Sequence, residues 1–359
     1  MSELPIGENV RLTQFSKGSG CGCKIAPAIL EKMLSTSGAH RSFPGLLVGN
    51  ETRDDAAVLE LSGGQCLIST TDFFTPIVDD AFDFGRIAAA NAISDVYAMG
   101  GKPVMAVAIL GFPVEKLPVE LAGRILEGAH AVCQQAGIPL AGGHSIDTPE
   151  PIFGLAVNGL VAKSNLKRNN TAKAGDLLYL TKPLGVGILA AASKRGKANA
   201  ADLKVAINVM AQLNTVGESL GEIQEVHAMT DVTGFGLLGH LMEICKGSAL
   251  MAEIDLSCLP ILEQANTYRE QFIFPDNTYR NWNAYEKEVV GINGPEFITL
   301  CDPQTSGGLL FAVSPDQQEV ITELLITAGL DAHVKPIGRM IERTDAMKQS
   351  GSWISVKSD

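Results

Sequence analysis

The sequence has few aromatic residues, no basic region and no long apolar run, and each absence narrows the range of functions. Phe, Trp and Tyr make up 6% of its 359 residues, whereas small residues, including 37 glycines, are abundant. Small residues in such numbers favour closely packed elements and backbone that lies near ligands. The net charge is −12 and Lys and Arg do not cluster, so we expect no nucleic acid as a partner. The acidity is compatible with magnesium or a magnesium-bound nucleotide, and equally with an ordinary solvated surface.

Membrane insertion, secretion and a disulfide framework are also disfavoured. The longest apolar run, residues 103–114, has about half the length that a bilayer requires. Residues 1–11 include two glutamates and no apolar stretch, so no signal peptide is expected. The seven cysteines are odd in number and scattered, which favours free thiols in a reducing cytosol. We therefore expect a cytoplasmic protein that does not enter a membrane.

Hydrophobic periodicity predicts two α+β domains of similar size, separated by the polar segment 162–175. The elements predicted for the first domain are strands 56–61 and 66–71 joined across Gly63-Gly64, helix 84–99, buried strand 104–110, helix 119–136, and strands 138–141 and 152–161. Those predicted for the second are strands 177–181, 249–254, 309–313 and 334–341, and helices from 186, at 203–220, at 234–246 and at 317–328. Residues 255–296 are expected to be irregular.

Several aspartates occur where an α/β scaffold presents polar side chains to a ligand. They are Asp54, Asp55, Asp72, Asp95 and Asp231. Asp55 precedes a predicted strand, Asp72 follows one, and Asp231 follows the short run 226–230. Magnesium is usually held by one or two carboxylates plus substrate phosphates, so these positions suit a site that splits phosphoanhydrides. For any single aspartate, a turn or a helix N-cap is an alternative explanation.

Asp95 is harder to explain as a surface residue. It lies within the predicted helix 84–99, and Asn91 precedes it by one turn on the same face. The neighbouring residues are small and mostly apolar, without the Lys, Glu or Arg of a solvent-exposed face. A carboxylate in such surroundings should be paired or metal-bound.

The segment 17–24 is rich in glycine and contains Cys21-Gly22-Cys23-Lys24. It predicts a mobile loop, followed by a short helix at 27–34. A zinc site usually has a wider Cys spacing and a second pair, and a disulfide across one residue would be strained. Lys24 close to Cys21 would favour the thiolate, which suits a soft substrate or nucleophilic catalysis. An exposed linker with incidental cysteines is the alternative.

Three other segments are rich in glycine. Residues 142–145 and 302–308 are predicted to be turns whose backbone N–H groups approach anionic oxygens, although many such turns only reverse the chain. Residues 234–239 match G-x-G-x-x-G, but the α/β alternation breaks down afterwards, so a dinucleotide site is disfavoured. No G-x-x-x-x-G-K-[ST] is present, so any nucleotide binds without a P-loop.

Seven segments together resemble the selenophosphate synthetase family (selenide, water dikinase), part of the aminoimidazole ribonucleotide synthetase-like ATP-binding superfamily. They are residues 20–24, 49–55, 69–72, 91–95, 141–145, 229–236 and 301–308. The Cys-Gly-Cys-Lys loop is particular to this family, whereas the Asp and Gly motifs occur more widely in the superfamily. The resemblance runs in register along nearly the whole chain, and residues 257–296 are its least distinctive part.

The resemblance implies a two-domain, aminoimidazole ribonucleotide synthetase-like α+β fold whose N-terminal domains pair into a β-barrel in a homodimer. The domains expected from it are a mobile glycine-rich catalytic loop with an N-terminal extension at 1–50, an N-terminal ATP-binding domain at 51–163 and a C-terminal domain at 174–345. It also implies the Mg²⁺-dependent conversion of ATP, selenide and water to selenophosphate, AMP and phosphate, which supplies selenium for selenocysteine and selenouridine. Because free selenide is toxic and scarce, a selenium-delivery protein is a further candidate partner.

The family's functional residues carry over by position. The catalytic positions match Cys21 and Lys24, and the Mg²⁺ ligands match Asp55, Asp95 and Asp231. The ATP-site positions match Lys24, Thr52, Arg53, Asp54, Asp72 and Asp95, together with Gly143, His144 and Ser145 in a turn that reaches ATP across the dimer interface.

Three other functions compete with this interpretation. An amidine-forming ATP-dependent ligase of the same superfamily would release ADP and gives no reason for the Cys21-Gly22-Cys23-Lys24 loop. A dinucleotide-dependent oxidoreductase would bind NAD(P)H through residues 234–239. A non-catalytic carrier of selenium or metal would bind its cargo without nucleotide turnover, and it leaves the aspartates unexplained.

Overall fold

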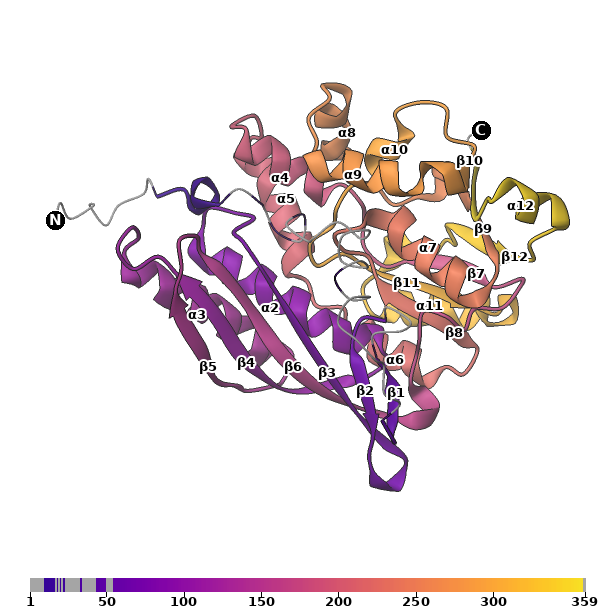
Figure 1. Cartoon of the computed structure of the whole chain (residues 1–359), viewed down its shortest axis with the longest axis horizontal. Coiled ribbons are helices and arrows are strands. Elements are labelled where there is room, and N and C mark those ends of the chain that lie inside the picture. Colours follow the sequence, from indigo (N-terminus) through magenta and orange to yellow (C-terminus); the bar gives the residue numbers. More distant parts are fainter. Residues whose placement is uncertain are drawn as a thin grey trace.

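Two β-sheets, one in each half of the chain, organise the protein (Figure 1). The computed structural model describes residues 10–16, 18, 20, 22, 33, 43–49 and 54–357. In this part of the chain the first sheet has the strand order β1-β2-β3-β6-β4-β5, and the second has the order β10-β13-β9-β12-β7-β11-β8. Both sheets mix parallel and antiparallel pairs. The predicted two-domain α+β architecture is therefore confirmed.

The strands and helices alternate irregularly along the chain. The first half contains β1 (Leu46–Val48), β2 (Ala57–Glu60), β3 (Gln65–Phe74), α2 (Ala81–Ala98), β4 (Lys102–Phe112), α3 (Val119–Gln135), β5 (Leu140–Asp147) and β6 (Ile152–Ala162). The second half contains β7 (Leu177–Leu180), α4 (Val186–Lys194), α5 (Ala200–Ala211), α6 (Val216–Glu222), β8 (Val226–Asp231), α7 (Gly236–Ser248) and β9 (Met251–Asp255). It continues through α8 (Glu263–Glu270), α9 (Asp276–Tyr285), β10 (Val289–Val290), α10 (Glu296–Leu300), β11 (Leu309–Val313), α11 (Gln318–Thr327), β12 (Gly338–Ile341), α12 (Asp345–Ser350) and β13 (Ile354–Lys357).

Helix α2 lies between the first sheet and the second domain and contacts elements of both (Figure 1). Its N-terminus is capped by Asp80, whose side chain accepts the backbone N–H of Asp83 at 2.8 Å, so the helix begins three residues before the predicted start. It ends before Gly100, which has a φ of +73°. Every residue from 87 to 98 is buried. A helix that is covered all round carries small and apolar residues instead of a polar stripe, which accounts for its alanines.

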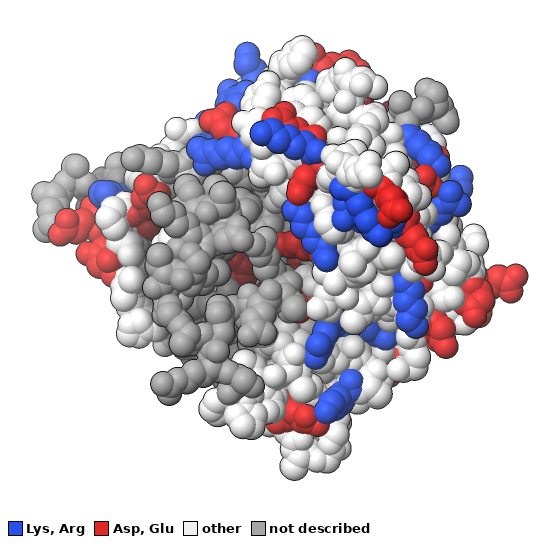
Figure 2. All heavy atoms as spheres, turned by 45° about the vertical axis from the view of Figure 1, so that its right-hand side comes forward, with Lys and Arg blue, Asp and Glu red and all other residues white. Residues whose placement is uncertain are grey.

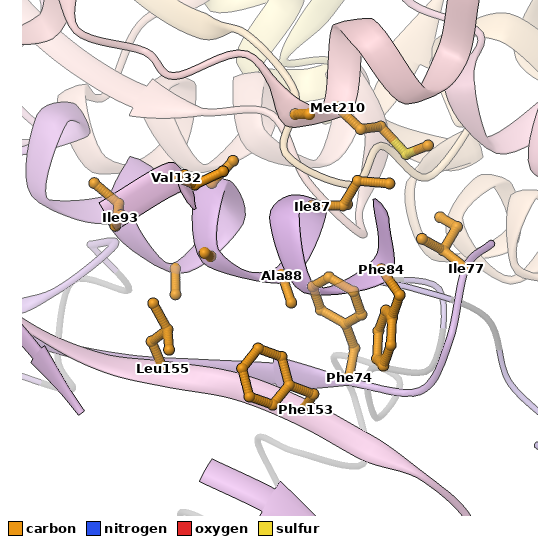
Figure 3. Close-up of a cluster of buried hydrophobic side chains, with 14 of the residues drawn as sticks. Phe74, Ile77, Phe84, Ile87, Ala88, Ile93, Val132, Phe153, Leu155 and Met210 are labelled. Atoms are coloured by element: carbon orange, nitrogen blue, oxygen red, sulfur yellow. The ribbon is translucent and has the colours of Figure 1, made fainter. Parts of the chain in front are cut away.

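The hydrophobic core continues from one domain into the other through α2. On the sheet side, Phe84 of α2 contacts Phe74 and Phe153, with ring centroids 6.0 and 6.3 Å apart, which is a favourable range for aromatic pairs. On the other side, Ile87 faces Met210 of α5 (Figure 3). The residues of α2 are therefore held in place by both halves of the chain.

The opposite face of the first sheet exposes apolar side chains. Phe73, Met105, Ile146 and Leu160 are 46, 39, 54 and 38% exposed. The expectation that residues 104–110 form a buried strand is therefore wrong in part, because only one face of β4 is covered by helices within the chain. Among the described helices, none combines the length and apolarity needed to cross a membrane.

Other predicted elements differ from the structure. The helix expected at 203–220 is broken into α5 and α6 by residues 212–215. Residues 255–296, expected to be irregular, contain α8, α9 and the start of α10. The strand expected at 334–341 is limited to β12, and Asp72 lies within β3 instead of after it. The helix expected at 27–34 lies outside the described residues.

Candidate functional site

Three carboxylates from distant parts of the chain converge at the interface between the domains. Asp55 lies just before β2, Asp95 near the end of α2, and Asp231 at the end of β8. One oxygen of each lies within 4.8 Å of an oxygen of the other two. Asp95 and Asp231 are only 8 and 1% exposed. Three carboxylates this close repel one another unless a cation or a shared proton lies between them. We call Asp55, Asp95 and Asp231 the acidic cluster.

Each carboxylate of the acidic cluster accepts a hydrogen bond from a hydroxyl group. Thr230 Oγ1 donates to Asp55 Oδ1 at 2.8 Å, Thr70 Oγ1 to Asp95 Oδ2 at 2.5 Å, and Ser94 Oγ to Asp231 Oδ2 at 2.6 Å. Hydrogen bonds of this kind orient carboxylates that ligate metals. The cluster is therefore a supported arrangement and not a chance meeting of flexible side chains.

The cluster could hold a metal ion. Oδ2 of Asp55 is buried and receives no hydrogen bond from the described residues. Burial, followed by the nearby charges of Asp231 and Asp95, raises the pKa of Asp55 well above its ordinary value. Carboxylate oxygens are the ligands that Mg²⁺ prefers. A divalent cation would reduce the repulsion between the three carboxylates and give Oδ2 of Asp55 a partner.

Asp72 and Asn91 form a second polar group beside the acidic cluster. Thr70 and Asp72 are two residues apart in β3, so their side chains lie on the same face of the strand, towards α2. Asn91 Nδ2 donates to Asp72 Oδ2 at 2.5 Å, and its Oδ1 accepts the backbone N–H of Ser306 at 2.7 Å. This amide therefore connects Asp72 of the first domain to the 302–308 segment of the second.

Asp54 also contacts the second half of the chain. Its Oδ1 accepts the backbone N–H of Asn169 at 2.8 Å, in the segment between the two domains. Asp55, Asp72, Asp95 and Asp231 thus lie along one interface, and Asp54 contacts the segment that joins the two domains.

Gly143, His144 and Ser145 do not form the predicted turn. They lie in β5, where they pair in parallel with residues 108–110 of β4. Strands β6 and β4 separate β5 from β3, so this segment is not part of the interface described above. A Cβ on Gly143 would lie 2.1 Å from the carbonyl oxygen of Ala108. Gly143 therefore permits a close approach of β5 to β4, next to a register shift between these strands.

Register places His144 on the exposed face of the first sheet. In β5, His144 is opposite Ile109 of β4. Ile109 is opposite Gly154 of β6, and Gly154 is opposite Phe73 of β3. Residues that are directly opposite share a face, so His144 lies on the side of Phe73 and Ile146. It points away from the face that carries Asp72.

Cys21, Lys24, Thr52 and Arg53 lie outside the described residues. Gly20, which precedes Cys21, donates its backbone N–H to the carbonyl of Thr75 at 3.0 Å. A Cβ on Gly20 would lie 2.5 Å from Oγ1 of Thr305. Gly20 therefore packs against the 302–308 segment at the domain interface.

Two buried polar residues of this interface were not predicted from the sequence. Lys182 is 2% exposed, and its Nζ donates to the carbonyls of Gln212 at 2.7 Å and Ser306 at 2.8 Å. Desolvation lowers the pKa of this lysine to about 7, although Asp231 opposes the shift. Asn214 is 3% exposed and donates to Ser94 Oγ and to the carbonyl of Gly307, both at 2.8 Å. Only their tertiary partners reveal them, because isolated Lys and Asn residues carry no signal in a sequence.

The structure also removes the basis for a dinucleotide site at residues 234–239. Such a site requires a parallel strand-helix-strand unit. Within the described chain, β8, which precedes α7, is an edge strand paired antiparallel with β11. On the face in Figure 2, the described basic and acidic side chains are interspersed over the second domain, without a continuous basic area.

Sequence comparisons identify relatives along nearly the whole chain. The family profile described as AIR synthase related protein, N-terminal domain, matches residues 53–161, and that of the C-terminal domain matches residues 173–347. A selenide, water dikinase of Colwellia psychrerythraea is 54% identical over 336 residues, which cover 94% of this chain and 97% of its own. One of Pseudomonas aeruginosa is 54% identical over 338 residues, covering 94% and 98%.

Solved structures with the same fold are more distant in sequence. Thiamine-monophosphate kinase from Stenotrophomonas maltophilia has a TM-score of 0.64 at 22% identity, covering 94% of this chain and 97% of its own. Hydrogenase maturation protein HypE in complex with ATP has a TM-score of 0.64 at 20% identity, covering 85% and 84%. By the identity and coverage of its sequence relatives, the chain belongs to the selenide, water dikinase family, within the AIR synthase related proteins.

Proposed function

We propose that this protein is a selenophosphate synthetase, which converts ATP, selenide and water to selenophosphate, AMP and phosphate. Its identity to selenide, water dikinases over 94% of the chain carries this conclusion. Two anhydride bonds of ATP break in the reaction; one phosphoryl group goes to selenium and the other to water. The product supplies activated selenium for selenocysteine and selenouridine.

The acidic cluster is proposed to hold Mg²⁺ through Asp55, Asp95 and Asp231. Its support is the convergence of the three carboxylates within 4.8 Å and the unpartnered Oδ2 of Asp55. Bound magnesium would neutralise charge on the phosphate oxygens. The hydroxyls of Thr70, Ser94 and Thr230 keep the carboxylates oriented for that purpose.

The remaining site residues belong to the same proposal. Asp54 and Asp72 are assigned to the ATP site with Asp95, as are Thr52 and Arg53, which lie outside the described residues. Lys24 would supply fixed positive charge to ATP, and Cys21 would position selenide or carry selenium transiently. In this scheme, 1–50 supplies the catalytic loop, 51–163 the ATP-binding domain and 174–345 the C-terminal domain.

We further propose a homodimer in which the exposed faces of two first sheets close into a β-barrel. Phe73, Met105, Ile146 and Leu160 give that face its apolar character, and burying them would be favourable. In the dimer, Gly143, His144 and Ser145 would serve ATP bound by the partner subunit; the outward position of His144 supports this. We place the enzyme in the cytosol, where its thiols stay reduced. We also propose a selenium-delivery protein as a partner.

Nucleotide analysis by anion-exchange chromatography tests the proposed reaction. Under anaerobic conditions with ATP and magnesium, AMP should accumulate only when selenide is present. An ATP-dependent ligase of the same fold would release ADP instead. A carrier would bind its cargo without consuming ATP. Either result would overturn the proposal.

A further inference from the structure

The break between α5 and α6 places a buried amide at the centre of the domain interface. Residue 212 leaves the helix with an extended backbone (φ −74°, ψ 131°), and Asn214 follows it. The two N–H bonds of the Asn214 amide go to Ser94 Oγ and to the carbonyl of Gly307, both at 2.8 Å. One contact is in the first domain and the other in the second, and α2 lies against both α5 and α6 (Figure 1).

The hydrogen bond from Asn214 determines where the Ser94 proton points. A serine hydroxyl has one proton and rotates freely unless its neighbours select a direction. Because Ser94 Oγ accepts from Asn214, its own proton is directed to Asp231 Oδ2, 2.6 Å away. Asp231 accepts this bond with one carboxylate oxygen, which limits rotation of the carboxylate within the acidic cluster.

Lys182 holds both the segment that carries Asn214 and the segment that carries its partner Gly307. Its Nζ donates to Gln212, two residues before Asn214, and to Ser306, next to the Gly307 carbonyl that Asn214 contacts. Lys182 therefore ties the segment that carries Asn214 to the 302–308 segment within the second domain. The same segment reaches Asp72, since Ser306 donates to Asn91.

We propose that Asn214 is a positioning residue for Asp231, acting through Ser94 to hold this carboxylate in the orientation that binds the divalent cation. This inference rests on the proposed metal site, but concerns Asn214, which lies in none of the seven segments that carry the family resemblance. A purely structural tie between the domains would stabilise the fold without affecting metal affinity. A measurement of metal affinity therefore distinguishes a positioning role of Asn214 from a purely structural one.

Mn²⁺ binding followed by the EPR signal of the free ion tests the inference without using the enzyme's activity. The titration compares the full-length wild type with Asn214→Leu, with and without β,γ-methylene ATP, after subtracting the Mn²⁺ that the analogue binds alone. Asn281→Leu is the matched control, because Asn281 is similarly buried, at 2% exposed, and donates to two carbonyls, those of Gly234 and Cys301. Ser94→Ala removes only a hydroxyl and serves if Asn214→Leu does not fold.

The expected result is Mn²⁺ binding about tenfold weaker in Asn214→Leu and in Ser94→Ala, the usual scale for a residue behind a metal ligand, and unchanged in Asn281→Leu. Adding Asn214→Leu to Ser94→Ala should weaken binding no further, because both act on one contact. If Asn214→Leu and Ser94→Ala bind Mn²⁺ as tightly as the wild type, or if their losses of Mn²⁺ affinity add in the double variant, the role of Asn214 is overturned and the proposed metal site stands. No protein-dependent Mn²⁺ binding by the wild type would overturn the proposed metal site as well.

Discussion

Replacing Asp55 by Asn should stabilise the metal-free protein while removing its response to magnesium. The carboxylate oxygens of the acidic cluster lie within 4.8 Å of one another. At an effective dielectric constant of about 20, two full charges at this distance repel by about 3.5 kcal/mol. Burial and this repulsion raise the pKa of Asp55, and solvent weakens the repulsion because Asp55 is only partly buried. We therefore expect a gain of about 1–2 kcal/mol in the free energy of unfolding.

The substitution keeps the shape and one hydrogen bond of the side chain. In the Asp55→Asn variant, the amide oxygen can accept the bond from Thr230 that Asp55 Oδ1 receives at 2.8 Å. The amide N–H groups can donate towards Asp95 and Asp231. The gain should also depend on pH. A group whose pKa is raised by folding stabilises the folded state below its unfolded pKa, and this contribution is lost as pH rises through the folded pKa. The advantage of Asp55→Asn should therefore grow from acidic towards neutral pH.

Urea unfolding near neutral pH, in EDTA and again with saturating magnesium, measures both effects. Asp176→Asn is the control, since Asp176 is 2% exposed and is bonded to His227 at 2.9 Å. This variant should lose stability and keep the magnesium response. Loss of stability in Asp55→Asn in EDTA, or a magnesium response equal to that of the wild type, would refute the reasoning.

Three further predictions concern other parts of the molecule. Folding lowers the pKa of Lys182 from 10.5 to about 7, so the unfolded state binds more protons between these values and stability should rise with pH there. The gain in the free energy of unfolding is at most about 4–5 kcal/mol. Urea unfolding at several pH values should show a smaller gain in Lys182→Met, and a gain equal to that of the wild type would exclude Lys182 as its source. Cys21→Ser should lose selenide-dependent AMP formation by chromatography, and undiminished formation would rule out a role for Cys21 in handling selenium. Ile146→Asp places a charge on the exposed face of the first sheet and should give a monomer by sedimentation; an unchanged dimer would contradict the proposed pairing.

Local patterns predicted the elements that depend mainly on apolar periodicity and glycine. The predicted strand 309–313 coincides with β11, and α2 ends at Ala98, one residue before the predicted end of the helix. The aspartates beside strands were identified because an α/β scaffold presents polar side chains to ligands at strand ends. Asp95 was identified because a carboxylate in apolar surroundings needs a partner. Their meeting within 4.8 Å depends on how the domains pack, which the sequence pattern does not contain.

Elements that depend on tertiary contacts were missed. Helices α8 and α9 are polar, so apolar periodicity did not reveal them, and α9 is also rich in residues of modest helix propensity. They are held by contacts such as Tyr268 to Asp202 at 2.6 Å and Asn281 to Gly234 at 3.0 Å. The break after α5 has the same origin, since Asn214 finds its partners in other elements.

The most direct test of the proposed function is anaerobic phosphorus NMR of the purified protein with ATP, magnesium and selenide. The proposal predicts AMP, orthophosphate and a new phosphorus signal coupled to selenium, all dependent on selenide. ADP as the only nucleotide product, or the absence of a selenium-coupled signal, would contradict it.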